Sequence, residues 1–259
     1  MTAAMPAPAG ITRPVNPVAK LAAAALIAVC LVLTLDPVSA GTALVLELAL
    51  VPFLGIPWSR LWRRTLPVLA AAPLTGLTIA LYGRTSGEVY AEFLLARVSE
   101  GSLAFALATA LRVLAIGLPA VVLFITVDPT DLADGLAQTW RLPSRFVLGA
   151  LAGTRLIGLA AEDRRTVQLA RRARGVGDRG LLRRIAGVAF SMLVLAIRRG
   201  STLATAMEAR GFGSGIPRTW ARRAHFGGRE WAFVAAGAII GGAAIAAALL
   251  AGTWTPVVS

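Results

Sequence analysis

The residues best suited to chemistry in this 259-residue chain are two arginines inside a repeated tripeptide. The tripeptide occurs as Ala173-Arg174-Gly175 and again, 36 residues later, as Ala209-Arg210-Gly211. Each copy closes a long helix-forming run, because glycine accepts the left-handed conformation that ends a helix and arginine faces the last carbonyl groups. A guanidinium at a helix tip stays charged and pairs bidentately with a carboxylate. One copy alone would be an ordinary basic helix end, but two copies on adjacent long helices favour a binding role.

The chain lacks the residues that catalysis or metal binding would need. The chain has one histidine, His225, and one cysteine, Cys30, so a catalytic triad, a histidine or cysteine metal site and a disulfide are not expected. Lys20 is the sole lysine among 26 basic residues and lies between Ala19 and Leu21, so the chain lacks the Gly-Lys-Ser/Thr of a phosphate-binding loop. We therefore expect a non-catalytic protein with no metal, no cofactor and no ATP hydrolysis of its own.

The composition predicts a multi-pass membrane protein, since 57% of the residues are hydrophobic. Apolar runs near the roughly 20 residues that cross a bilayer lie at 21–35, 41–57, 66–82, 102–127 and 230–250. The first could also be a signal peptide ending at Val38-Ser39-Ala40, but we favour an uncleaved span because further spans follow at once. Arg112 interrupts the fourth run, where a structural ion pair or carbonyl capping is expected rather than substrate binding.

The charges predict the orientation of these spans. Arg13 and Lys20 precede the first span, three arginines (60, 63 and 64) follow the second, and residues 83–101 are net acidic. Because cytoplasmic loops are enriched in Lys and Arg, the N-terminus is expected inside. Residues 141–229 hold 18 arginines against four acidic residues and should also be cytoplasmic. Their few aromatic residues argue against nucleic acid and leave anionic lipid or a protein partner.

The basic block reads as two long helices after a short one. An X-Pro turn at Asp128-Pro129 begins a short amphipathic helix that includes Leu132 and should lie at the membrane surface. Leu142-Pro143-Ser144 then starts a helix of about 144–174, with Ser144 as its N-cap, and a second follows at about 181–210; each would be about 45 Å long. Small residues should let the two approach closely: Gly149, Ala152, Gly153, Gly158, Ala186, Gly187 and Ala196. Alternatively, the apolar half of each is another membrane span.

Several of these motifs, in this order, resemble the transmembrane T component of energy-coupling factor (ECF) transporters, the EcfT/CbiQ/BioN family. The similarity covers roughly residues 14–215. It comprises Asn16-Pro17-Val18-Ala19-Lys20-Leu21, Arg112, Thr126-Val127-Asp128-Pro129-Thr130-Asp131-Leu132, Leu142-Pro143 and the two Ala-Arg-Gly ends, which are its specific part. Asn16 stands where an acidic residue is common in the family.

The resemblance implies an all-α polytopic membrane protein with about five transmembrane helices and two long crossed cytoplasmic coupling helices. Its parts would be an N-terminal membrane domain (1–127), a coupling domain (128–229) and a C-terminal transmembrane helix (230–259). Each Ala-Arg-Gly tip would dock in one of two ABC ATPase subunits, which bind the ATP. Pro17, Lys20, Arg112, Asp128, Pro129, Leu132 and Pro143 would have structural or interface roles.

The function so implied is coupling within an importer in a bacterial or archaeal cell membrane. The chain would connect its ATPases to a separate substrate-binding S component that takes up a vitamin or a transition-metal ion. The substrate itself is not written in the chain. Two alternatives are a conventional ABC permease with its own substrate path, whose spans should carry more polar residues than Glu47 and Arg112, and a membrane-embedded enzyme, which lacks a catalytic cluster.

Overall fold

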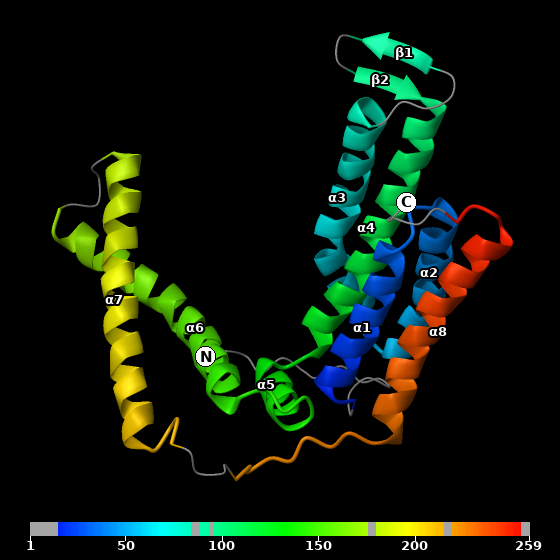
Figure 1. The fold of residues 1–259 in the computed structure, drawn as a ribbon. Helices are drawn as coiled ribbons and strands as arrows, with labels where there is room; N and C mark the ends of the chain where they lie inside the picture. The colour runs from blue at the N-terminus through cyan, green and yellow to red at the C-terminus, as the bar shows by residue number, and fades with distance from the viewer. Residues whose placement is uncertain (1–14, 84–88, 94–95, 176–179, 215–218, 255–259) are drawn as a thin grey trace. The chain divides into compact units, whose positions relative to one another are not determined.

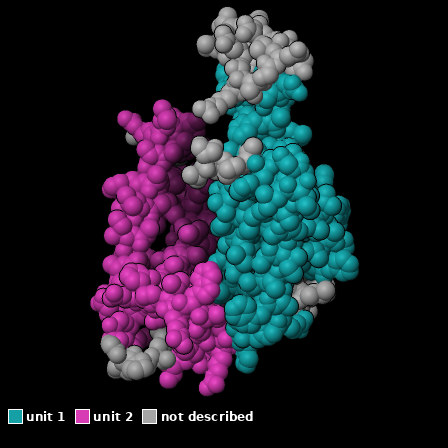
Figure 2. Space-filling view, turned by 45° about the vertical axis from the view of Figure 1, so that its right-hand side comes forward, with its two compact units in different colours: residues 1–132, 225–259 teal, residues 133–224 magenta. Residues whose placement is uncertain are grey.

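The computed structural model describes residues 15–83, 89–93, 96–175, 180–214 and 219–254. The chain divides into two compact units, which Figure 2 colours separately. Unit 1 consists of residues 1–132 and 225–259, and unit 2 of residues 133–224. Each unit is described here by itself.

Unit 1 is a bundle of apolar helices with one small hairpin (Figure 1). Its elements are α1 (Pro17–Val32), α2 (Pro37–Leu50), the 3-10 helix η1 (Val51–Leu54), α3 (Trp58–Tyr82), β1 (Val89–Phe93), β2 (Ala96–Ser99), α4 (Glu100–Thr126) and α8 (Gly228–Leu250). Helix α4 packs against α3 and α2, while α8 packs against α1 and α2. Residues from distant parts of the chain form the shared core, including Ile27, Ala43, Ala115 and Ile240.

The predicted all-α membrane fold is confirmed. Among the described residues, five segments are long and apolar enough to cross a membrane: Pro37–Leu54, Trp58–Tyr82, Glu100–Leu123, Ser144–Ala173 and Gly228–Leu250. The predicted first span corresponds to α1, an apolar helix of 16 residues. The sequence did not predict the antiparallel pairing of β1 with β2, in which Glu92 lies opposite Arg97 and Phe93 opposite Ala96.

Asn16 fastens the start of α1 to the start of α8. As the N-cap of α1, its Oδ1 accepts the Val18 N–H at 3.0 Å. Its Nδ2 donates to the His225 carbonyl oxygen at 3.0 Å, and its backbone N–H donates to Glu230 Oε1 at 3.3 Å. An aspartate could cap the helix but could not donate to that carbonyl oxygen. The asparagine therefore makes a contact that an aspartate at this position could not make.

Unit 2 contains the two long helices that the sequence predicted. Helix α5 (Pro129–Gln138) leads from unit 1 into it, and α6 (Ser144–Ala173) and α7 (Leu181–Ala209) agree with the predicted 144–174 and 181–210. The prediction that Ser144 is the N-cap was wrong, because the cap is Pro143, whose carbonyl oxygen accepts the N–H of Phe146 at 3.0 Å. Val147 packs on Ala133 and Ala137 and joins α6 to α5.

Helices α6 and α7 meet between the polar half of α6 and the region 187–199 of α7. Arg199 of α7 forms a bidentate ion pair with Asp163 of α6. Further along α6, Arg171 covers Gly187, so closely that a Cβ on Gly187 would lie 2.5 Å from Arg171 Nη2. The expectation that the α6 glycines would form the close approach was wrong: at Gly149, Gly153 and Gly158 an added Cβ would have no neighbour within 4 Å among the described atoms.

Candidate functional site: the two helix tips

The first Ala-Arg-Gly tripeptide ends α6 in the way its sequence predicts. Ala173 is the last helical residue and Arg174 is the C-cap. Gly175 has a φ of 68°, the left-handed conformation that residues with a side chain rarely adopt. Its N–H donates to the Arg172 carbonyl oxygen at 3.0 Å. The chain therefore leaves the helix immediately after the arginine.

The second tripeptide repeats this ending on α7. Arg210 is the C-cap after Ala209, and Gly211 has a φ of 80°. The Gly211 N–H donates to the Glu208 carbonyl oxygen at 2.9 Å, and the Phe212 N–H donates to the Met207 carbonyl oxygen at 2.9 Å. Such hydrogen bonds satisfy carbonyl groups that the helix itself leaves unpaired. Both tips thus combine a fixed backbone exit with an arginine at the last turn.

Both tips are open to binding. All six residues of the two tripeptides are exposed. Within the described part of the chain, neither Arg174 nor Arg210 has an ion-pair partner. A cation near a helix C-terminus is favoured locally by the partial negative charge of the last carbonyl groups. The N–H donors in the plane of each guanidinium nevertheless remain available to an external carboxylate.

The two tips lie on opposite sides of the crossing. Arg171 contacts Gly187 and Asp163 contacts Arg199, so advancing along α6 corresponds to going back along α7. The two helices therefore run in roughly opposite senses, and Figure 1 shows their C-terminal ends pointing away from each other. Arg174 and Arg210 each lie 11 residues beyond their helix's member of the Asp163–Arg199 pair. At 1.5 Å per residue each tip is about 16 Å from that ion pair along its own helix.

Other arginines of the two helices have different surroundings. Arg171 is half-buried, and its Nε is buried without a hydrogen-bond partner among the described residues. Arg199 is bound to Asp163. Arg172 and Arg198, in contrast, are exposed on the helix sides. These last two are therefore the matched controls for any test of the tips.

The residues with expected structural roles lie mostly at helix starts. Pro17, Pro129 and Pro143 stand at the beginnings of α1, α5 and α6. Asp128 Oδ1 accepts the Thr130 N–H at 2.7 Å, which starts α5, and Leu132 is half-buried within it. These positions fix where the helices begin.

The two basic residues within apolar helices differ in their contacts. Lys20 is 5% exposed, and its Nζ donates to the Thr126 carbonyl oxygen at 3.4 Å, which joins α1 to the end of α4. For Arg112 the expected carbonyl capping is not observed at Nε and Nη2, which are buried without a partner in the described structure.

The sequence analysis missed the Asp163–Arg199 pair. A signal for it exists, since these residues are separated by the same 36 positions as the two tripeptides. Each stands ten residues before the alanine of its own tripeptide. The two residues thus occupy equivalent positions relative to the two tripeptides, with an acid on one helix and a base on the other.

Comparison with known proteins assigns the family. The family model described as "CbiQ: Cobalt transport protein" matches residues 10–219. The chain is 27% identical over 229 residues to the energy-coupling factor transporter transmembrane protein EcfT of Bacillus selenitireducens, covering 84% of this chain and 85% of that protein. It is also 27% identical to the EcfT protein of Limosilactobacillus fermentum over 183 residues, covering 66% and 68% of the two chains. Among its described residues five helices are long and apolar enough to cross a membrane, and the chain is a multi-pass membrane protein of the CbiQ/EcfT family, the transmembrane component of energy-coupling factor transporters.

Proposed function

We propose that this chain couples two ABC ATPase subunits to a substrate-binding S component that imports a vitamin or a transition-metal ion. The observation that carries the proposal is the pair of exposed arginine tips, Arg174 and Arg210, on equivalent helix ends. In this proposal each tip docks against a carboxylate of one ATPase, because arginine is suited to bidentate pairing. The chain itself has no cofactor, and its partners bind and hydrolyse the ATP.

The geometry of unit 2 supports two separate partners rather than one. The tips stand at opposite ends of two helices that run in roughly opposite senses, and this arrangement favours two separate docking grooves over one. A movement of one ATPase toward the other would act on both tips and change the angle at which α6 and α7 cross. The ion pair and the packed Arg171–Gly187 contact would carry that change from one helix to the other. In the proposal, the membrane-facing sides of these helices pass the change to the S component.

Co-purification tests the partner composition directly. The affinity-tagged chain, extracted from its native membranes in mild detergent, is expected to bring with it ABC ATPase subunits in a total ratio of two per chain and one small hydrophobic protein. Native mass spectrometry of the complex measures this stoichiometry. A chain that purifies with ATPases and transports substrate without any small membrane partner would instead be a permease with its own path.

The proposed topology places the N-terminus and the two tips in the cytoplasm of a bacterial or archaeal cell. In a Cys30→Ser background, a cysteine at Thr253, exposed after α8, should react with an impermeant thiol reagent applied to intact cells. A cysteine at Ser201, exposed on α7, should react only after permeabilisation. Alternating spans with the basic loops inside require this pattern. Labelling of Ser201→Cys from outside would mean that α7 is not cytoplasmic, and the tips could then not reach cytoplasmic ATPases.

A further inference from the structure

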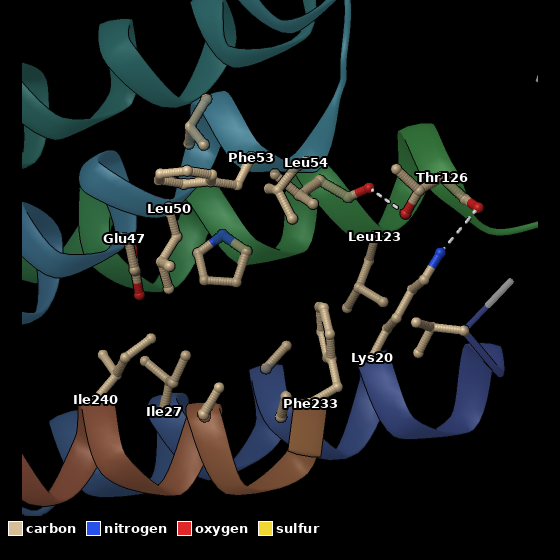
Figure 3. A pocket seen from close by; sticks show the side chains of 18 of the residues that line it. Lys20, Ile27, Glu47, Leu50, Phe53, Leu54, Leu123, Thr126, Phe233 and Ile240 are labelled. Carbon is tan, nitrogen blue, oxygen red and sulfur yellow. Dashed lines mark hydrogen bonds between the residues drawn. The ribbon is translucent and has the colours of Figure 1, made fainter. Parts of the chain in front are cut away.

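Unit 1 contains a half-open cavity of about 380 Å³ between α1, α2, η1, α4 and α8 (Figure 3). Its volume is within the range of small-molecule sites. Most of the wall is apolar, with aromatic rings at Phe53 and Phe233 and aliphatic side chains such as Ile27, Leu123 and Ile240. An apolar cavity with few polar groups takes a ligand that is itself mainly apolar.

One carboxylate faces this apolar space. Glu47, near the end of α2, is 6% exposed, and Figure 3 shows its side chain directed across the cavity toward Ile27 and Ile240. Both of its carboxyl oxygens are buried and have no hydrogen-bond partner among the described residues. A buried carboxyl group without a donor is costly, and polar groups with no partner inside a protein often mark a binding site. Glu47 needs a donor that the described chain does not supply.

The end of the cavity opposite Glu47 carries a basic side chain. Lys20 lies there and its Nζ donates to the Thr126 carbonyl oxygen. Arg229 also lines the cavity and precedes Glu230, which contacts Asn16 near the start of α1. Lys20 is seven residues from Ile27 along α1, so the two ends are about 10 Å apart. A positive group on a ligand would be repelled by the lysine and arginine and attracted by Glu47. The charges therefore define the direction in which such a ligand would lie.

We propose that the cavity binds an apolar organic cation whose ammonium group donates to Glu47. The ammonium supplies hydrogen bonds and the charge that balances the carboxylate. Its hydrocarbon part fills the apolar space between Glu47 and the Lys20 end, beside Phe233. Coupling of ATPases to an S component does not require this site, so the inference goes beyond the proposed function.

Direct binding with three matched probes tests the proposal. The purified full-length chain in lipid nanodiscs is titrated with radiolabelled octylammonium, octanol or octanoate, and binding to empty nanodiscs is subtracted. Octylammonium should bind saturably at one site per chain and at least tenfold more tightly than octanol, because a charge-assisted hydrogen bond is stronger than a neutral one. Octanoate, whose carboxylate offers Glu47 no hydrogen-bond donor, should show no saturable binding.

Two variants locate the site. Glu47→Gln should lower octylammonium affinity about tenfold to a hundredfold and leave octanol unchanged, since it removes the charge but keeps the shape. Ala24→Phe, which places a ring inside the cavity, should abolish binding of both probes. Glu162→Gln, an exposed acid on α6, is the control and should change neither. The thermal midpoint of each variant is measured to verify folding.

Three results would overturn the proposal. One is equal binding of octylammonium and octanol to the original chain. Another is octylammonium binding that survives Glu47→Gln in a folded variant, which would mean that the cation is held elsewhere. The third is the absence of saturable binding of any probe, in which case Glu47 is an internal carboxyl group without a ligand. The assay contains no ATPase, so failure here and failure of the coupling function are independent.

Discussion

Replacing both Arg174 and Arg210 by glutamate should stop transport and release the ATPase subunits, while the chain remains folded in the membrane. Each arginine is exposed on a helix tip and lacks an ion-pair partner within the described structure, so its removal breaks no observed internal contact. The double variant should therefore lose its binding to the ATPase subunits and keep its own fold. The measurement is the amount of ATPase that co-purifies with the tagged chain, together with substrate uptake in reconstituted vesicles.

The single variants should weaken docking strongly but incompletely. Leaving one carboxylate of a buried, hydrogen-bonded pair without its partner costs about 3–5 kcal/mol, which corresponds to two to three decades in affinity. Two tips that hold two partners joined by their own contacts act as a bivalent system, in which one intact tip keeps the other partner at a high local concentration. The double variant should consequently lose far more ATPase than either single variant.

Control variants separate this effect from a general loss of positive charge. Arg172→Glu and Arg198→Glu change exposed arginines of the same helices and should retain most of the bound ATPase. Arg174→Gln and Arg210→Gln guard against a helix-end artefact, since a glutamate at a helix C-terminus is itself unfavourable by about 0.3–1 kcal/mol. If the double variant keeps stoichiometric ATPase and transports normally, the tripeptides only terminate helices, and the proposed coupling function loses its main support.

The sequence predicted the parts of the structure that local chemistry determines. Glycine readily adopts the left-handed conformation that ends a helix, and Gly175 and Gly211 both have a positive φ. Proline has no backbone N–H and fits the start of a helix, so Pro129 and Pro143 correctly indicated the starts of α5 and α6. Apolar length likewise indicated α2, α3, α4 and α8, whereas α1 is shorter than a typical span, and α6, predicted as a coupling helix, is itself long and apolar enough to cross a membrane. The helix tips were recognisable for this reason, although their role as anchors stays a prediction.

The parts that depend on tertiary contacts were not predictable in this way. The α6 glycines suggested close packing, but the α6–α7 contact lies further along, where a long Arg171 side chain covers Gly187. Asn16 seemed a small departure from the family pattern until its three hydrogen bonds to α1, His225 and Glu230 were known. Glu47 was noticed as a lone charge, but only the packing of several helices around it creates a cavity. Such contacts join residues far apart in the sequence, and no local pattern encodes them.

Reversing the charge of Asp163 or Arg199 is expected to lower transport about tenfold without releasing the ATPases. The pair joins α6 to α7 with two hydrogen bonds and is partly exposed, with side-chain exposures of 24% for Asp163 and 41% for Arg199. An ion pair at such a site contributes up to about 1 kcal/mol, and reversing one charge replaces attraction by repulsion of similar size. The crossing would then lose about 1–2 kcal/mol, enough for roughly a tenfold shift in the population of the coupled geometry.

The charge-swapped double variant decides whether the pair itself is responsible. Asp163→Arg combined with Arg199→Asp restores opposite charges across the same crossing, so transport should recover to within about threefold of the original chain while each single reversal stays low. Raising the salt concentration should reduce the defect of the single variants, because exposed charges are screened. ATPase co-purification should stay constant throughout, since the tips at Arg174 and Arg210 are untouched. If the swap is no better than the worse single variant, the two residues act through separate partners and the crossing is held by the Arg171–Gly187 packing instead.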